Sequence, residues 1–131
     1  MLDTSAVVDY LLGQSSAGQV KEIIDAEGGS AAPDIVVSET LSALRRLVAR
    51  SVIRPYRAGQ AVSDLGDISV ALFPTLAFRE RAWRFRDNMT AADALFVALA
   101  EALDEPLVTK DHRLATATRR HTGVRVVELV G

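Results

Sequence analysis

The sequence predicts an α/β fold with a mostly parallel sheet. Short apolar runs alternate with amphipathic stretches along the chain, as strands and their connecting helices do in this fold class. The length of 131 residues, of which 49% are hydrophobic and 24% charged, indicates one globular domain over residues 1–131. No repeat or low-complexity segment interrupts this alternation.

Helical periodicity marks seven stretches. Gly28 and Gly29 stop the second of them, and the third and fourth each open at a proline, which suits a first helical turn. The sixth is apolar nearly all the way round, with only Asp93 and Glu101 on one narrow side, so we expect it to be buried. In order, the expected helices span residues 5–12, 17–26, 33–50, 55–65, 75–86, 90–103 and 111–121.

The expected strands are the short apolar runs between these helices. Residues 69–73 alternate in polarity, as a half-buried strand does. Residues 1–4 contain only the end of a strand, because Met1 and Leu2 are the only apolar residues before the first helix. In order, the expected strands span residues 1–4, 30–32, 69–73, 106–109 and 124–129.

Composition excludes several classes of site. The chain has no cysteine, which rules out disulfides, cysteine-ligated zinc, iron–sulfur clusters and thiol nucleophiles. It shows neither a signal peptide nor a run of about 20 apolar residues, so we expect a cytoplasmic protein with no membrane partner. The formal net charge of −2 gives no sign of nucleic-acid binding.

Four acids lie shortly after predicted strands or at the start of predicted helices. These are Asp3, Glu39, Asp93 and Asp111. Ligands of an open parallel sheet bind outside the carboxyl ends of the strands, so all four are candidates for one site. Each also has a purely structural alternative. Asp3 and Asp111 suit helix N-caps, Asp93 suits a capping box with Thr90, and Glu39 suits a surface position.

Four segments lie in order along the chain: Asp3-Thr4-Ser5, residues 36–44 with Glu39, residues 90–100 with Asp93, and residues 107–114 with Asp111. Together they resemble the motifs of the PIN-domain family, and in particular of its VapC-type toxins. Only Met1 and Leu2 precede Asp3, whereas family members usually have a longer apolar strand there.

The resemblance implies a three-layer α/β/α sandwich with a central, mostly parallel sheet. It also implies a growth-inhibiting endoribonuclease toxin in which Asp3, Glu39, Asp93 and Asp111 hold Mg²⁺ or Mn²⁺. Carboxylates are the usual ligands of such ions, and a metal-activated water can hydrolyse a phosphodiester bond.

Several further residues are candidates for supporting roles. Ser5 and Thr109 match the hydroxyls that line the family's site, although turn and cap bonding would explain them equally well. Arg113 lies two residues after Asp111. The arginines that could extend a path for RNA are Arg45, Arg46, Arg50, Arg119 and Arg120. For any single arginine of this kind, a solvated helix face is the simpler explanation.

The resemblance also implies partners. A small VapB-like antitoxin would wrap the chain and place a basic side chain in the acidic pocket. A homodimer is expected as well, through the apolar faces of helices 5–12 and 33–50, unless both faces pack into their own core. The competing hypothesis is a catalytically degenerate PIN-like module that binds without cleaving.

Overall fold

The computed structural model describes all 131 residues and contains two pairs of parallel strands. β1 (Ser30–Pro33) pairs with β2 (Val70–Phe73), and β3 (Leu107–Thr109) pairs with β4 (Val126–Glu128). β2, β3 and β4 each lie within the stretch predicted from the sequence. β1 begins as predicted but continues one residue further, through Pro33.

The N-terminal segment joins the two pairs into one sheet. The Leu2 N–H donates to the Ala31 carbonyl at 3.1 Å, and the Asp3 N–H donates to the Val108 carbonyl at 3.1 Å. Leu2 also forms a parallel bridge with Val108. The order across the sheet is therefore β2, β1, the N-terminal segment, β3 and β4. The predicted strand end at residues 1–4 is reduced to this bridge, because α1 already begins at Thr4.

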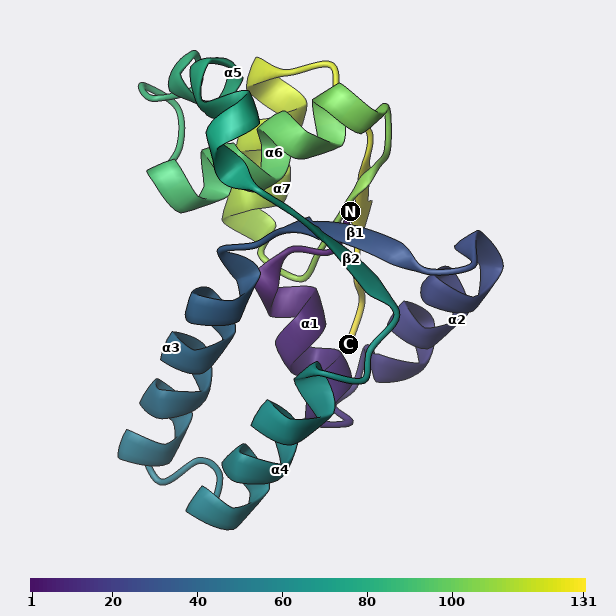
Figure 1. Ribbon diagram of the computed structural model, residues 1–131, viewed down its shortest axis with the longest axis vertical. Helices are drawn as coiled ribbons and strands as arrows, with labels where there is room; N and C mark the ends of the chain where they lie inside the picture. Colours follow the sequence, from purple (N-terminus) through teal and green to yellow (C-terminus); the bar gives the residue numbers. More distant parts are fainter.

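Helices cover both sides of the strands, with α1 to α4 on one side and α5 to α7 on the other (Figure 1). This arrangement confirms the predicted three-layer α/β/α fold with a central parallel sheet. None of the helices combines the length and the apolar surface that a bilayer crossing requires. Their bounds are α1 (Thr4–Leu11), α2 (Ala17–Glu27), α3 (Val36–Ala49), α4 (Pro55–Leu65), the 3-10 helix η1 (Thr75–Phe78), α5 (Arg79–Trp83), α6 (Ala91–Leu103) and α7 (His112–His121).

The prediction that Pro33 opens a helix is wrong. Pro33 ends β1 opposite Phe73, and α3 begins only at Val36. Proline has no N–H to donate to a neighbouring strand, so the pairing continues only through the next residue. Here the Asp34 N–H donates to the Phe73 carbonyl at 2.9 Å. Pro55, by contrast, opens α4 as predicted.

The single helix predicted over residues 75–86 is also wrong in part. The segment forms η1 and then α5, which ends at Trp83, and turns follow. Phe78 separates the two with φ −118° and ψ 25°, which are not α-helical angles.

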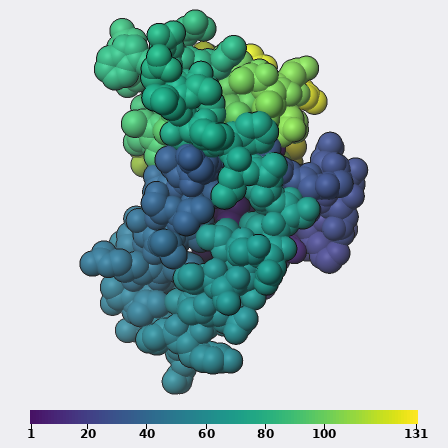
Figure 2. Space-filling view, in the orientation of Figure 1, coloured from purple at the N-terminus to yellow at the C-terminus, as the bar shows by residue number.

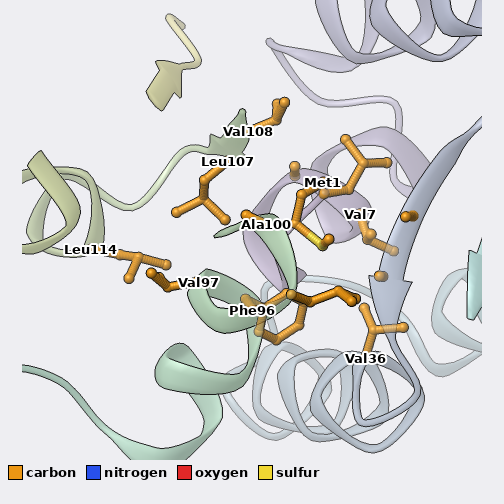
Figure 3. Close-up of a cluster of buried hydrophobic side chains, with 14 of the residues drawn as sticks. Met1, Val7, Val36, Phe96, Val97, Ala100, Leu107, Val108 and Leu114 are labelled. Carbon is orange, nitrogen blue, oxygen red and sulfur yellow. The ribbon is translucent and has the colours of Figure 1, made fainter. Parts of the chain in front are cut away.

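One hydrophobic cluster of 25 buried residues holds the layers together. Figure 3 shows side chains from several elements meeting there, among them Val7 of α1, Val36 of α3, Phe96 of α6 and Leu114 of α7. Along α6, Ala94 and the run from Phe96 to Ala100 are buried, as predicted for this helix. The cluster therefore anchors the helices whose first turns lie at one edge of the sheet.

Candidate active site

The four acids singled out by the sequence border one cavity. Asp3, Glu39, Asp93 and Asp111 all line a hollow of about 490 Å³. Its walls come from α1, α3, the start of α6 and the turn between β3 and α7. Because α1, α3 and α7 begin where strands end, their first turns meet at the carboxyl edge of the sheet, where parallel sheets bind ligands.

Each acid lies at the start of a helix. Asp3 and Asp111 are the N-caps of α1 and α7. Glu39 and Asp93 lie in the first turns of α3 and α6. The partial positive charge at a helix N-terminus favours an ionised carboxylate there. The capping roles that the sequence allows are therefore combined with a place in a shared cavity.

Hydrogen bonds hold both carboxylate oxygens of Asp3. Oδ1 accepts from the Ser5 hydroxyl at 2.7 Å and from the Ala6 N–H at 3.0 Å. Oδ2 accepts from the Thr109 hydroxyl at 2.6 Å. Thr109 Oγ1 in turn accepts from the Asp111 N–H at 2.9 Å. Ser5 and Thr109 therefore tie the start of α1 to the turn between β3 and α7.

Burial raises the pKa of Asp3 to about 6, although hydrogen bonds from Thr109, Ser5 and Ala6 lower it. The nearby charge of Asp111 is a smaller cause that also raises this pKa. Only 5% of the Asp3 surface is exposed. A cation in the cavity would favour the ionised form of such a carboxyl group, because opposite charge lowers its pKa.

Asp93 is affected by the other acids of the cavity. Burial raises the pKa of Asp93, and the charges of Asp111 and Glu39 add to this effect. A hydrogen bond with Thr90 and the charge of Arg113 act in the opposite direction. The acids are therefore close enough to repel one another.

Asp111 keeps one carboxylate oxygen available. Its Oδ1 accepts from the N–H groups of Arg113 at 2.9 Å and Leu114 at 3.2 Å, which caps α7. Oδ2 accepts no hydrogen bond from the protein, and the side chain is exposed. This oxygen can bind a ligand without disturbing the helix cap.

The donor set fits a hydrated divalent cation. No group of three acids lies close enough together to hold an ion entirely by direct contacts. Mg²⁺, however, usually takes one or two protein carboxylates and keeps several of its waters. Four carboxylates around one cavity, with mutual repulsion that a cation would relieve, meet that requirement.

The cavity also contains a buried ion pair that the sequence motifs do not mark. The Asp9 side chain is 3% exposed and accepts a hydrogen bond from Lys110 Nζ at 3.0 Å. Ser16 donates to Asp9 through its N–H at 2.8 Å and through its hydroxyl. Burial acts to raise the pKa of Asp9, but the hydrogen bonds from Ser16 and Lys110 outweigh it and lower the pKa.

We expect Lys110→Met to lower the free energy of unfolding by about 1–2 kcal/mol. The change leaves the buried Asp9 carboxylate without its cation, and the partial exposure of Lys110 moderates the loss. Urea denaturation measures the effect. Lys21→Met is the control, because Lys21 and Asp25 form an exposed pair on α2 and their loss should not be resolvable. Equal changes in both variants would contradict a structural role for the Lys110 pair.

The two arginines proposed from the sequence lie near the acids in different ways. Arg46 borders the cavity from α3, and Arg50 borders it one turn further along the same helix. Arg113 does not border the cavity, but its charge lowers the pKa of Asp93. The sequence marks Arg50 only as one of several arginines that could bind RNA. In the structure it borders the acid cavity together with Arg46, whereas Arg45 borders a different groove.

Comparison with known proteins agrees with this architecture. Residues 1–119 match the family described as the PIN domain. The chain is 36% identical over 127 residues to Ribonuclease VapC9 of Mycobacterium tuberculosis, covering 97% of each chain. It is 39% identical over 118 residues to Ribonuclease VapC1 of the same organism, covering 89% of each.

A solved structure shares the fold. The crystal structure of PAE2754 from Pyrobaculum aerophilum superposes with a TM-score of 0.71 at 17% sequence identity, covering 95% of this chain and 80% of that chain. The family match spans most of the sequence, and the mycobacterial relatives are matched over most of their length. The chain therefore belongs to the PIN-domain family, among its VapC-type members.

Proposed function

We propose that the chain is an endoribonuclease dependent on Mg²⁺ or Mn²⁺, and the growth-inhibiting toxin of a VapBC-type toxin–antitoxin pair in the cytoplasm. The observation that carries this proposal is the single cavity bordered by Asp3, Glu39, Asp93 and Asp111. It is supported by relatives in Mycobacterium tuberculosis that are named ribonucleases.

In this mechanism the four acids would hold the divalent ion, some of them through water. The ion would supply activation of a water and stabilisation of charge on the phosphate. Asp3 contributes a carboxylate whose position is set by Ser5 and Thr109. Asp111 contributes the oxygen that the helix cap leaves free.

Arg113 and Arg46 contact phosphates of the RNA in the same mechanism. A guanidinium group suits phosphate because its planar fork can donate two parallel hydrogen bonds. Neither arginine forms an ion pair within the protein, and each lies near the acids, Arg46 as part of the cavity wall and Arg113 through its charge.

The test is cleavage of cellular RNA by the purified chain, with RNA ends mapped by sequencing. We expect new 5′-phosphate and 3′-hydroxyl ends in Mg²⁺ or Mn²⁺ and none in EDTA. The matched variant is Asp111→Asn, because asparagine caps a helix as well as aspartate does and should preserve α7. Identical maps from both proteins would overturn the nuclease and favour a PIN-like module that only binds.

Divalent metal should raise the melting temperature of the chain by several degrees. An ion that binds the folded state alone stabilises it in proportion to the logarithm of its concentration over Kd. Differential scanning fluorimetry in EDTA, Mg²⁺ and Mn²⁺ measures the shift, with Asp111→Asn as the variant expected to shift less. No shift at several millimolar Mg²⁺ or Mn²⁺ would contradict a metal site in the folded chain.

The charge of the four acids supports an antitoxin partner that carries a basic side chain. We propose a small VapB-like protein that inserts a basic side chain among the acids, where it would relieve the repulsion acting on Asp93. Such a side chain would occupy the place of the metal ion. Co-purification with the product of a neighbouring gene, and loss of RNA cleavage in the complex, would support it.

An apolar hollow offers a second contact surface. Figure 2 shows a depression between α3, α4 and β2 with α1 at its floor. Val37, Leu41, Val62 and Leu72 border it and are 39–49% exposed. Exposed apolar patches of this kind mark protein contacts. We propose a homodimer through this face of α3, whereas Ala6, Val7 and Leu11 of α1 are buried in their own core.

Light scattering after size-exclusion chromatography tests the dimer. Leu41→Asp should shift the protein towards the monomer. Leu76→Asp is the matched control, because Leu76 is 71% exposed and lies on η1, outside the hollow. A monomer at all concentrations, or equal behaviour of the two variants, would overturn the proposed interface.

A further inference from the structure

One face of α3 connects the acids to two arginines. Glu39, Ala43, Arg46, Leu47 and Arg50 all line the acid cavity. Their spacing is that of a single helix face. At about 1.5 Å rise per residue, Arg46 lies about 10 Å and Arg50 about 16 Å along the helix axis from Glu39. The cavity is therefore a groove with the four acids at one end and Arg46 and Arg50 towards the other, while Asp9 and Lys110, which also line it, neutralise each other as an ion pair.

The two guanidinium groups are available to a ligand. Arg46 and Arg50 are exposed, and neither forms an ion pair or a side-chain hydrogen bond. Arg81 and Arg119, by contrast, are paired with glutamates. Two unpaired guanidinium groups on one wall favour an anionic ligand and disfavour a basic peptide in this part of the groove.

The remaining lining suits a nucleic-acid strand. Val8 of α1 and the α3 residues Ala43 and Leu47 supply apolar surface between the charged ends, and Thr4 and Gln14 supply polar groups. A polynucleotide strand presents charged phosphates on one side and the apolar faces of its bases on the other. The volume of about 490 Å³ lies in the range of pockets that hold small ligands, which suits a few nucleotides of one strand and not a duplex.

We propose that the groove between α1 and α3 is a track for single-stranded RNA, in which Arg46 and Arg50 bind phosphates on one side only of the cleaved bond. The track presupposes that the chain is a ribonuclease, as proposed. Arg113 lies beside the acids, at the cleaved bond, whereas Arg46 and Arg50 lie towards the other end of the groove. Contacts to the RNA backbone beyond the scissile phosphate are therefore asymmetric.

α3 provides a matched control for this asymmetry. Arg45 is adjacent to Arg46 in the sequence, carries the same charge and is equally classed as exposed. It lines a different groove, between α3 and α4, together with Leu41 and Val62. An effect of overall charge would be shared by Arg45 and Arg46, whereas an effect of the track would belong to Arg46 and Arg50 alone.

The first measurement is the salt dependence of RNA binding. A fluorescein-labelled, mixed-sequence single-stranded RNA is titrated with the Asp93→Asn chain in Mg²⁺, so that binding is observed without cleavage. Each phosphate contact contributes about 0.7 to the slope of log K against log salt for single strands. Changing both Arg46 and Arg50 to alanine should weaken binding roughly tenfold and reduce the slope by about 1.4. Arg45→Ala should leave the slope unchanged.

The second measurement removes charge from the RNA. In a substrate that the unsubstituted chain cleaves, single phosphates are replaced by neutral methylphosphonates on either side of the cleaved bond. Neutral linkages on one side should reduce cleavage, and those at equal distance on the other side should not. In the chain with alanine at positions 46 and 50, the same neutral linkages should not reduce cleavage further. Such non-additivity is what a double-mutant cycle shows when an arginine contacts the phosphate directly.

The outcomes separate the track from the enzyme. Cleavage that falls equally in Arg45→Ala and Arg46→Ala, or neutral linkages that act equally on both sides, would overturn the track and leave the ribonuclease standing. Loss of antitoxin binding with unchanged RNA binding in the Arg46 and Arg50 variant would also overturn it, in favour of a protein ligand. A chain that neither binds nor cleaves RNA would overturn both. Arg45, Arg46 and Arg50 are all exposed, so their variants should fold, and thermal melts check this.

Discussion

Asp93→Asn is expected to lower kcat for RNA cleavage by roughly a hundredfold to ten-thousandfold, the range for removing a group that acts in the transition state. Asparagine has nearly the shape of aspartate but cannot supply a charged oxygen to a divalent ion. The fold should be preserved, because Thr90 still accepts the hydrogen bond from the residue 93 N–H that caps α6. The loss should therefore appear in kcat, while the free energy of unfolding stays nearly unchanged.

The opposite end of the same helix provides the control. Asp104 is the C-cap of α6, with φ 53° and ψ 44°, a left-handed conformation that asparagine also adopts readily. It does not border the acid cavity. Asp104→Asn makes the same chemical change on the same helix and should keep full activity. The measurement is kcat and KM on one cleaved RNA. If Asp93→Asn is as active as the unsubstituted chain, Asp93 is not an active-site residue.

Asp3→Asn should abolish a pH-dependent loss of stability worth about 3 kcal/mol. Because burial raises the pKa of Asp3 from 3.8 to about 6, the folded chain holds this proton more tightly than the unfolded chain. The stabilisation is complete below about pH 4 and is lost as the pH rises through about 6. An amide at position 3 does not titrate, so the variant should lack this decline.

Urea denaturation in EDTA between about pH 4.5 and 7 measures the difference between the two proteins. Subtracting the variant removes the contribution of Asp93, whose pKa is raised in the same direction. Asp9 acts in the opposite sense, since its pKa is lowered and its stabilisation is lost only at lower pH. Parallel stability curves for the two proteins would show that Asp3 is not protonated in the folded chain near pH 6.

The sequence predicts those features that depend on local signals. Pro55 opens α4 because proline suits a first turn, and the apolar stretch around Phe96 becomes the buried helix α6. Pro33 carries the same signal but ends β1, because strand pairing with Phe73 outweighs the local preference. Local patterns cannot distinguish the two cases, since the partner strand lies about forty residues away.

The candidate site shows the same division. The acids follow strand ends and match ordered motifs, so the sequence alone groups Asp3 with Asp111. The Asp9–Lys110 pair cannot be predicted from such local patterns. Asp9 is the only charged residue of α1, and its cation is 101 residues away, so only the folded chain brings them together. The choice between Arg45 and Arg46 likewise depends on which face of α3 turns towards α1.

The hydrogen bond between Asp3 and Thr109 joins residues 106 positions apart. During synthesis on the ribosome, Asp3 therefore emerges long before the hydroxyl that orients it and before Asp111. A nascent chain that has not yet released residues 107–111 cannot assemble the acid cavity, however well its first helices have formed.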